Sequence, residues 1–466
     1  MSNPPTTPPP DAVAPQAAEE LYAVTPDFVR EVLDALEAGR VERVGELVGE
    51  LHSADLADLI GVITRAERKL LIQIIRAQLE PEVLSALEEG VRDEVVALLD
   101  PRDLAAAVAE LETDDAVYLL EALEEAEQRE ILEAVPEEDR AAVEVALTYP
   151  EDSAGRLMQR DLIAVPAYWN MGQTIDYMRE SDDLPDEFYE IFVVDPAHRP
   201  IGTIPLNRAM RTKRPVAVSE IMVAEPKLVP VAMDQEEVAF LFRQYDLMSA
   251  PVIDDAGRLV GSITVDDVVD VIDEEAEEDI LHLGGVSETD LYLPVLRTTR
   301  TRFAWLLVNL FTAILASLVI WQFEATIERM VALAILMPIV ASMGGNAGTQ
   351  TLTVAVRALA TRELTATNAV HIIRKEALVG GANGVLFALL VGAVAALWFG
   401  DGALGLVIAA AMVINMVVAG LSGILIPLAC DRAGVDPAIS ASVFLTTITD
   451  VVGFFAFLGL AAWLLL

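Results

Sequence analysis

Five apolar stretches in the last third of this 466-residue chain are each long enough to cross a lipid bilayer. They lie at approximately 303–323, 330–358, 377–399, 403–429 and 437–466. Because a helix needs about 20 apolar residues to span roughly 30 Å of hydrocarbon, residues 297–466 are predicted to form an α-helical transmembrane domain with five spans per protomer. Four tryptophans fall near the expected span ends, as an interfacial belt requires: Trp305, Trp321, Trp398 and Trp463.

The charges between these stretches favour one orientation in the membrane. Basic residues precede the first span and separate the second from the third: Arg297, Arg300, Arg302, Arg357, Arg362, Arg374 and Lys375. The connections on the other side contain Glu324, Glu328, Arg329 and Asp401. Since basic connections stay in the cytoplasm, we expect a multi-pass protein of the inner (plasma) membrane. Its N-terminus is expected to be cytoplasmic and its C-terminus extracytoplasmic.

The net charge of −42 lies entirely before the membrane domain. Residues 297–466 contain 9 basic and 8 acidic residues, which leaves 22 basic and 65 acidic residues, a net charge of −43, in residues 1–296. Without a basic stripe to neutralise phosphates, nucleic acid is excluded as a partner. Cys430 is the only cysteine, so no disulfide can form within one chain. Six prolines in residues 1–20 predict a disordered tail.

Residues 21–148 have the pattern of an acidic helical domain. Leu, Val and Ala recur at three- and four-residue spacing, and capping residues begin the breaks, at Ser53, Asp100, Thr113 and Pro136. Asp55-Leu-Ala recurs as Asp103-Leu-Ala, which indicates stacked helical hairpins. We therefore predict an all-α superhelical domain, with a plain helical bundle as the alternative.

Residues 149–263 contain an internal repeat. Val193-Val-Asp195 and Gly202-Thr-Ile204 match Val252-Ile-Asp254 and Gly261-Ser-Ile263 at an offset of 59 residues. Each copy reads as a short helix followed by two strands that flank a turn. This order resembles a cystathionine-β-synthase (CBS) domain, so we expect an α/β tandem CBS pair that packs as one pseudo-symmetric sensor module.

A glycine-rich polar segment lies in the middle of the second apolar stretch. Pro338 is followed by Gly344-Gly345-Asn346-Ala-Gly348-Thr349-Gln350. We expect a break in the helix whose unwound carbonyls, together with Asn346, Thr349 and Gln350, offer oxygen dipoles to a hydrated cation. A helix-packing face of small residues would explain the glycines alone.

The fifth stretch contains one acid, Asp450, within Thr446-Thr-Ile-Thr449-Asp450. An unpaired carboxylate in the bilayer costs on the order of 3 kcal/mol, which marks Asp450 as a functional candidate. Mg²⁺, which keeps most of its waters, suits one or two such carboxylates and the nearby threonine hydroxyls. A protonated Asp450 bonded to a neighbouring helix and a proton relay are the alternatives. Asn415 in the fourth stretch is a weaker pore candidate, since a lone Asn more often joins helices.

The connection at 264–296 is the most acidic segment. Nine acids and no base occupy positions 266–279, among them Asp266, Asp267 and Asp270. One face of the expected helix is apolar: Val265, Val269, Ile272, Ala276 and Ile280. Other acids lie in the second repeat and the helical domain: Asp234, Glu236, Asp246, Asp114 and Asp115. A solvated face is one interpretation. The other is that bound divalent cations draw these acidic surfaces together at high cytoplasmic Mg²⁺.

A set of motifs gives the chain a close resemblance to the MgtE magnesium channels after its proline-rich tail. They are Tyr149-Pro-Glu151-Asp152-Ser-Ala-Gly155-Arg-Leu-Met158, Asp234-Gln-Glu236-Glu237-Val, Pro338…Gly344-Gly345-Asn346-x-Gly348-x-Gln350, Arg357-Ala-Leu-Ala-Thr-Arg362, Val435-Asp436-Pro437-Ala438 and Thr449-Asp450-Val. The resemblance implies a homodimer with ten spans around a central pore and a plug helix that closes it. It implies Asp450 as the pore carboxylate. The sensor acids it implies are Asp234, Glu236, Asp246, Asp267, Asp270, Glu275, Glu278 and Asp279.

Two positions depart from that pattern. Tyr118 stands where a further acid of the helical domain is expected. Nucleotide-binding CBS domains usually carry Ser/Thr-x-x-Asp after the last strand. The second repeat keeps this pattern as Thr264 and Asp267, but the first has Pro205 and Arg208, which argues against ATP as a ligand.

We therefore predict a Mg²⁺-selective, Mg²⁺-gated channel that admits magnesium passively and has no enzymatic activity. The chain contains no Walker A motif to couple ATP hydrolysis to transport. A proton- or sodium-coupled secondary transporter of Mg²⁺, Co²⁺ or Mn²⁺ is the alternative. A CBS-regulated membrane enzyme or receptor would need a nucleophile and a base. The four histidines occur in no such motif: His52, His198, His282 and His371.

Overall fold

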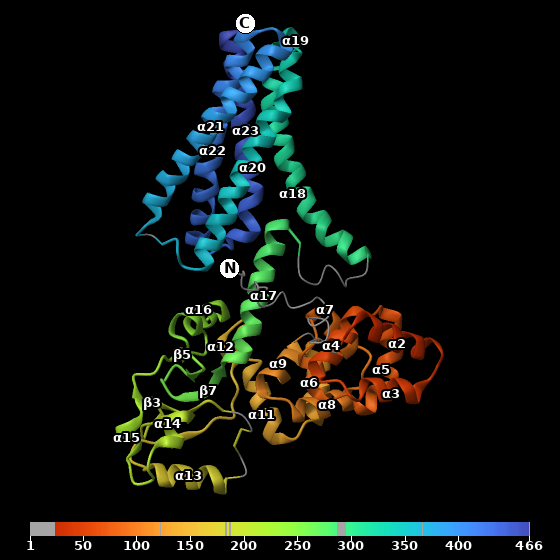
Figure 1. Ribbon diagram of the computed structural model, residues 1–466, viewed down its shortest axis with the longest axis vertical. Coiled ribbons are helices and arrows are strands. Elements are labelled where there is room, and N and C mark those ends of the chain that lie inside the picture. Colours follow the sequence, from red (N-terminus) through yellow and green to blue (C-terminus); the bar gives the residue numbers. More distant parts are fainter. Residues whose placement is uncertain are drawn as a thin grey trace, which may run out of the picture. The chain divides into compact units, whose positions relative to one another are not determined.

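The computed structural model describes residues 24–121, 123–181, 184–185, 188–286, 295–365 and 367–465. The predicted disordered tail at 1–20 and positions 287–294 of the predicted linker lie outside these residues. The described chain divides into two compact units, one ending at Glu274 and the other beginning at Glu275. Figure 1 labels the elements of both.

The first unit begins with short helices that stack as a superhelix. They follow one another from right to left in Figure 1. They are α2 Pro26–Glu37, α3 Val41–Val48, α4 Ser53–Val62, α5 Arg65–Ile75, η1 Arg76–Gln78, α6 Pro81–Ser85, α7 Glu89–Val96, α8 Pro101–Glu110, α9 Thr113–Glu121, α10 Glu125–Ala134 and α11 Glu137–Ala146. Helices two apart in sequence pack together, as α4 does on α6 and α9 on α11. The predicted superhelical domain is therefore confirmed, and α4, α8 and α9 begin at or directly after the expected capping residues.

Three strands of each repeat pair in the same way, and the sheet of the first repeat has a fourth strand. The first contains α12 Ala154–Leu157, β1 Ala164–Pro166, α13 Met171–Glu180, β2 Glu190–Val194, β3 Pro200–Pro205, α14 Leu206–Arg211, α15 Val218–Ile221 and β4 Val223–Ala224. The second contains β5 Val229–Pro230, α16 Gln235–Tyr245, β6 Ser249–Ile253 and β7 Leu259–Thr264. In each, one strand pairs in parallel with the next, which pairs antiparallel with the third. The register shifts between Val193 and Val194 and, 59 residues later, between Val252 and Ile253.

The acidic segment forms α17, Val265–Gly284, which is shared by the two units. Its buried face agrees with the predicted one only in part: Val265 and Ile272 pack against the core of the second repeat as expected. Val268 and Val271 are buried in the core of the second repeat, whereas Val269 and Ile280 are 51% and 70% exposed. The rest of the prediction is wrong because that core receives only the first two turns of α17.

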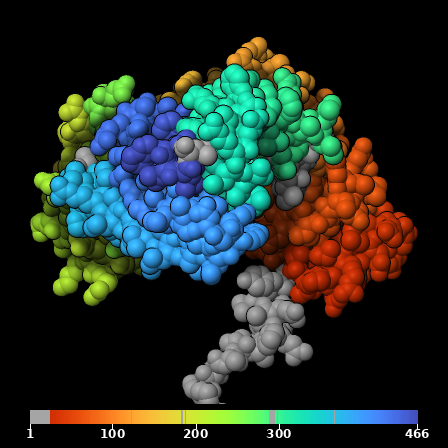
Figure 2. Space-filling view, turned by 90° about the horizontal axis from the view of Figure 1, so that it is seen from above, coloured from red at the N-terminus to blue at the C-terminus, as the bar shows by residue number. Residues whose placement is uncertain are grey.

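The second unit contains five helices that are long and apolar enough to cross a membrane within the described residues, as predicted. Its elements are α18 Val295–Gln322, α19 Glu324–Arg329, α20 Ala332–Ala360, α21 Ala369–Phe399, α22 Gly402–Ala433 and α23 Pro437–Leu464. Helix α22 is the centre of the bundle, because α20, α21 and α23 all pack against it. Helix α18 contacts α23, and α18 and α21 lie on opposite sides of the unit (Figures 1 and 2).

The structure contradicts the helix break that was predicted in the second apolar stretch, which forms α20. It continues without interruption from Ala332 to Ala360 through Pro338 and the glycines, so no unwound carbonyls face a pathway. Gly348 instead allows close helix packing, since a Cβ there would lie 2.8 Å from Leu445 Cδ1 of α23. Gly344 and Gly348 thus serve the packing role that was the alternative.

Candidate cation sites

Asp450 lies in the middle of α23, where it is half-buried and is the only charged residue of the helix. Thr446 lies one turn before it on the same side. The hydroxyls of Thr446 and Thr449 both donate to carbonyls of α23, at 3.1 Å to Val443 O and 3.1 Å to Leu445 O. Thr449 is fully buried. Of these three side chains, Asp450 therefore has the freest oxygen atoms for a cation.

The pore residues predicted on α20 do not all lie on the same side of this helix. Asn346 is exposed, and its Nδ2 donates to Ser342 Oγ at 3.4 Å. Gly345 has open space where a Cβ would stand. Gln350 lies one turn further on and lines a cavity formed with α21 and α22. The structure therefore brings α20 and α23 together at Gly348 but places Gln350 on the far side of α20 from α23.

Asn415 joins helices inside the bundle. It is fully buried, and its Nδ2 donates to Val340 O of α20 at 2.8 Å. It also packs against Gly344 and Gly453, which leave room for its amide. This is the interhelical contact that was the alternative to a pore role.

Six carboxyl groups meet where α9 and the residue before it face the start of α17, and we call them the acidic cluster. They are Glu112, Asp114, Asp115, Asp266, Asp267 and Asp270. Asp114 and Asp267 hydrogen-bond through their carboxyl groups. Within the described chain, Asp114 Oδ1 is buried without a hydrogen-bond partner. Two carboxylates in such contact need a shared proton or a cation between them.

Burial first, and repulsion between neighbouring carboxylates second, raise the pKa values of Glu112, Asp114, Asp115 and Asp267. Burial, with added repulsion from Asp267, raises the pKa of Glu112 to about 7. Burial raises the pKa of Asp115 and Asp267 to about 6, and it raises that of Asp114 well above its usual value. The negatively charged forms are disfavoured unless a positive ion compensates them. The sequence did not mark Glu112 as a site residue, because only the fold brings it near Asp267.

Asp267 is also held by its own repeat. Thr264 Oγ1 donates to Asp267 Oδ2 at 2.7 Å, and Gln159 Nε2 donates to the same oxygen at 3.3 Å. The carboxyl group that would bind ribose hydroxyls in a nucleotide-binding CBS domain is therefore engaged with Thr264, Gln159 and Asp114.

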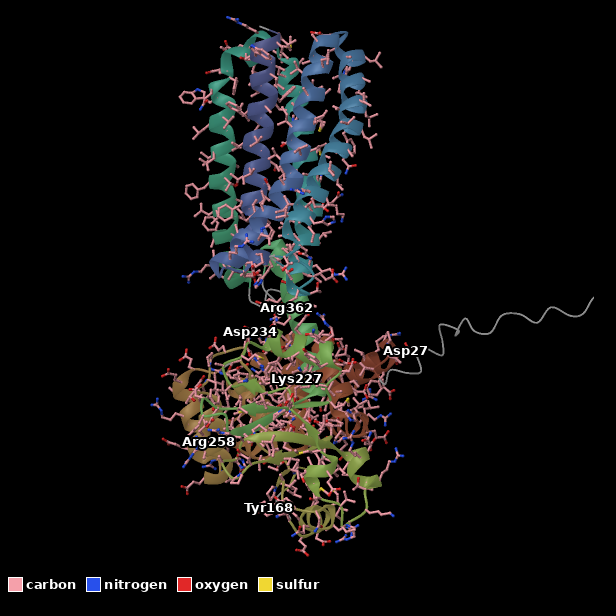
Figure 3. All side chains as sticks on the ribbon, turned by 90° about the vertical axis from the view of Figure 1, so that its left-hand side faces the viewer. Asp27, Tyr168, Lys227, Asp234, Arg258 and Arg362 are labelled. Carbon is pink, nitrogen blue, oxygen red and sulfur yellow. The ribbon has the colours of Figure 1, made fainter. Side chains whose placement is uncertain are left out.

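The remaining sensor candidates lie elsewhere. Asp234, labelled in Figure 3, caps α16 and accepts from the backbone N of Glu236 at 3.0 Å, and Asp246 ends the same helix with a φ of 52°. In the second unit, His282 Nδ1 lies 3.3 Å from Asp436 Oδ2 and 3.5 Å from Glu278 Oε1. Burial and Asp436 raise the pKa of Asp279. Glu275 belongs to the same stretch of α17.

Arg92 explains the departure at Tyr118. Its guanidinium carbon lies 3.7 Å from the centre of the Tyr118 ring, and its side chain is buried. Burial raises the pKa of Glu121 and Glu89, and Arg92 opposes this for both. A fixed positive charge thus occupies the region where a further acid was expected.

Neither the region of Asp450 nor the acidic cluster provides enough side-chain ligands for a metal ion that has lost its water shell. Within the residues that the structure describes, no three His, Cys, Asp or Glu side chains are arranged to hold one. Mg²⁺ fits this condition, because it keeps several waters and is bound through one or two carboxylates. Asp450 and the Asp114–Asp267 pair each provide such carboxylates.

Comparison with known proteins gives consistent matches. Family models described as "Divalent cation transporter" (MgtE), "MgtE intracellular N domain" and "CBS domain" match residues 337–460, 51–152 and 218–274. The magnesium transporter MgtE of Thermus thermophilus is 37% identical over 331 residues, 70% of this chain and 73% of that protein. That of Enterococcus faecalis is 31% identical over 320 residues, 69% of this chain and 71% of that protein. A solved structure of the cytosolic domain of the Mg²⁺ channel MgtE with ATP is 32% identical, covers 52% of this chain and 99% of that chain, and has a TM-score of 0.48.

Proposed function

Because the chain belongs to the MgtE family of magnesium transporters, we propose that it is a homodimeric, Mg²⁺-gated channel that admits Mg²⁺ passively. The observation that carries this proposal is Asp450, the only charged side chain of a 28-residue span. A half-buried carboxylate in a bilayer needs a compensating partner, and a hydrated cation supplies one. Two Asp450 side chains across a twofold axis would form a carboxylate pair in the pore.

Gating follows from the acidic cluster. At low Mg²⁺ its carboxylates repel one another, so the contact between α9 and α17 is weakened. Bound Mg²⁺ would offset the repulsion and hold the start of α17 against the helical domain. We infer that this held state corresponds to the closed channel. The further acids Asp234, Glu236, Asp246, Glu275, Glu278 and Asp279 are proposed to extend the sensor.

Orientation and energetics agree with uptake. The basic residues of the 357–375 connection favour a cytoplasmic location for that side, and hence a cytoplasmic N-terminus in the inner membrane. An inside-negative potential of 100 mV would then favour the entry of a divalent ion by about 4.6 kcal/mol. No ATP is needed for such transport. ATP is not proposed as a ligand, since Asp267 is engaged by Thr264, Gln159 and Asp114.

The proposal is tested by measuring Mg²⁺ flux into vesicles that contain the full-length protein. Wild type is expected to conduct with currents that reverse at the Mg²⁺ equilibrium potential. Asp450→Asn, which keeps the shape of the side chain, is expected to lose at least tenfold in flux, whereas Asp401→Asn, at the start of α22, serves as the matched control.

Two results would contradict the proposal. Undiminished flux in Asp450→Asn would remove this carboxylate from the pathway. Saturable uptake accompanied by stoichiometric proton or sodium counterflow, without single-channel currents, would favour the coupled transporter instead.

A further inference from the structure

A cavity of about 210 Å³ lies within the membrane unit between α20, α21 and α22. It forms because α20 and α21 both pack on α22 while touching each other little. Its polar lining consists of Gln350, Thr351, Glu376 and Asn383. Neither the Asp450 pathway nor the acidic cluster uses this cavity.

Glu376 is the charged group of the cavity and has weak partners. It lies two turns inside α21 and is 9% exposed. Thr351 Oγ1 donates to its Oε2 over 3.4 Å, and its Oε1 lies 3.5 Å from Nζ of Lys375, whose side chain is 63% exposed. Contacts of this length are weak hydrogen bonds, and an exposed lysine adds little. A buried carboxylate within a membrane helix therefore needs a further partner.

Close packing of α21 on α22 fixes this carboxylate in place. A Cβ on Gly380 would lie 2.6 Å from Met416 O, so the two helices touch backbone to backbone at the cavity wall. Glu376, Gly380 and Asn383 are spaced at i, i+4 and i+7 and thus line one face of α21. Gln350 and Thr351 of α20 form the opposite wall.

The size and donor set of the cavity match a hydrated ion. A water molecule takes up about 30 Å³ in the liquid, so the space holds roughly seven waters. Mg²⁺ prefers six oxygen ligands, most of them water, and one or two carboxylates. One carboxylate, two amides and one hydroxyl line part of this half-open space, and all of them offer oxygen acceptors to the protons of bound waters.

We propose that this cavity binds a hydrated divalent cation, with Glu376 as its charged ligand and Gln350, Thr351 and Asn383 as acceptors for its water shell. The site is distinct from that of Asp450. Gln350 and Val354 line the cavity on the α21 side of α20, whereas Leu352 and Val356 of the same helix pack with Leu445 of α23. The inference rests on the proposed function only for the identity of the ion.

Protection of a cysteine in the cavity tests the site in the full-length protein. Cys430→Ser removes the single native thiol, and Ala347→Cys places a new one on the cavity wall. The protein is reconstituted in phosphatidylcholine vesicles, and its modification by a water-soluble maleimide is followed across a Mg²⁺ titration. Thr353→Cys, on the exposed side of α20, is the matched control for changes caused by gating.

Mg²⁺ at ten times its dissociation constant is expected to slow modification of Ala347→Cys about tenfold. This protection should disappear when Glu376→Gln is added and persist in part with Glu376→Asp. The Thr353→Cys response should be the same with Glu or Gln at position 376. Equal protection in the Glu376→Gln protein, or none with Glu376 present, would overturn the proposal.

Lipid composition and Mg²⁺ flux distinguish a bound cation from a lipid headgroup, and this site from the proposed channel. Protection that requires phosphatidylethanolamine and not Mg²⁺ would overturn the site in favour of a lipid amine. Mg²⁺ flux is measured on the same vesicles. Glu376-dependent protection without flux would support the site while contradicting the proposed channel, and flux without such protection would overturn the site alone.

Discussion

The guanidinium carbon of Arg92 lies 3.7 Å from the centre of the Tyr118 ring, in the same helical domain whose acids face α17. Arg92 is 2% exposed, and within the described residues its Nε and Nη1 have no hydrogen-bond partner. The aromatic face and the carboxylates of Glu89 and Glu121 therefore compensate its charge. Arg92 acts as a permanent counter-ion beside a region that otherwise depends on bound cations.

Replacing Arg92 should destabilise the helical domain. Arg92→Gln removes the buried guanidinium that packs on the Tyr118 ring, a desolvated cation–π contact of about 2 kcal/mol. It also removes a positive charge that favours the ionised forms of Glu89 and Glu121, of which Glu121 keeps its ion pair with Arg156 at 3.0 Å. We expect the first thermal unfolding transition of the full-length protein to fall by several degrees. Arg102→Gln, at an exposed position of α8, is the control. An unchanged transition in Arg92→Gln would mean that Arg92 contributes no net stabilisation.

Acid and Mg²⁺ should stabilise the first unit in the same way. The pKa values of Glu112, Asp115 and Asp267 are raised to about 7, 6 and 6, above the values near 4 of an unfolded chain. Raised carboxyl pKa values mean that the folded state binds more protons, so stability falls as pH rises through 6 to 7. Without Mg²⁺, the unfolding temperature should drop between pH 5.5 and pH 8, and Mg²⁺ should restore it mainly at pH 8. Equal stabilisation by Mg²⁺ at both pH values would contradict this competition.

Asp114→Asn should uncouple the acidic cluster from Mg²⁺. The amide keeps the size of the side chain and can donate to Asp267, so one source of repulsion is replaced by a hydrogen bond. The unfolding temperature without Mg²⁺ is expected to rise, and the further gain on adding Mg²⁺ is expected to shrink. The rate of limited proteolysis within residues 266–290 is measured as a second readout of the contact between α9 and α17. Asp255→Asn, an exposed acid of the second repeat, should leave both quantities unchanged.

Asn415→Ala should affect stability more than conduction. It removes the 2.8 Å hydrogen bond to Val340 O inside the bundle, and such bonds average about 0.6 kcal/mol in membrane proteins. The thermal aggregation temperature should fall slightly, while Mg²⁺ flux per folded protein stays within about twofold of wild type. A large loss of flux at unchanged stability would assign Asn415 to the ion pathway.

Sequence patterns predicted the elements better than their contacts. Five spans and the α/β repeat were predictable because hydropathy and repeated motifs are local properties. The buried face of α17 was not, since which turn of an acidic helix meets a core depends on the neighbouring repeat. Pro338 suggested a broken helix, yet packing of α20 on α22 and α23 keeps it continuous.

The residues of the candidate sites were likewise predictable from sequence only where the signal is local. Asp450 could be identified from sequence because a single acid in a long apolar run is conspicuous. Glu376 does not stand out in the sequence because the apolar run begins at residue 377. In the structure α21 begins at Ala369 and includes Arg374, Lys375 and Glu376. The pairing of Asp114 with Asp267 joins residues 153 positions apart, which only the fold reveals.

The matching register shifts at Val193/Val194 and Val252/Ile253 show that the two repeats share the same irregularity in their strand pairing. The two copies nevertheless differ in the residues at the end of this hairpin. At equivalent positions one carries Pro205 and Arg208, and the other carries Thr264 and Asp267. In the second copy Thr264 donates to Asp267, whose carboxyl group contacts that of Asp114 in the helical domain. The first copy has neither a hydroxyl nor a carboxyl group at these positions, so the symmetry of the two repeats in fold does not extend to their chemistry.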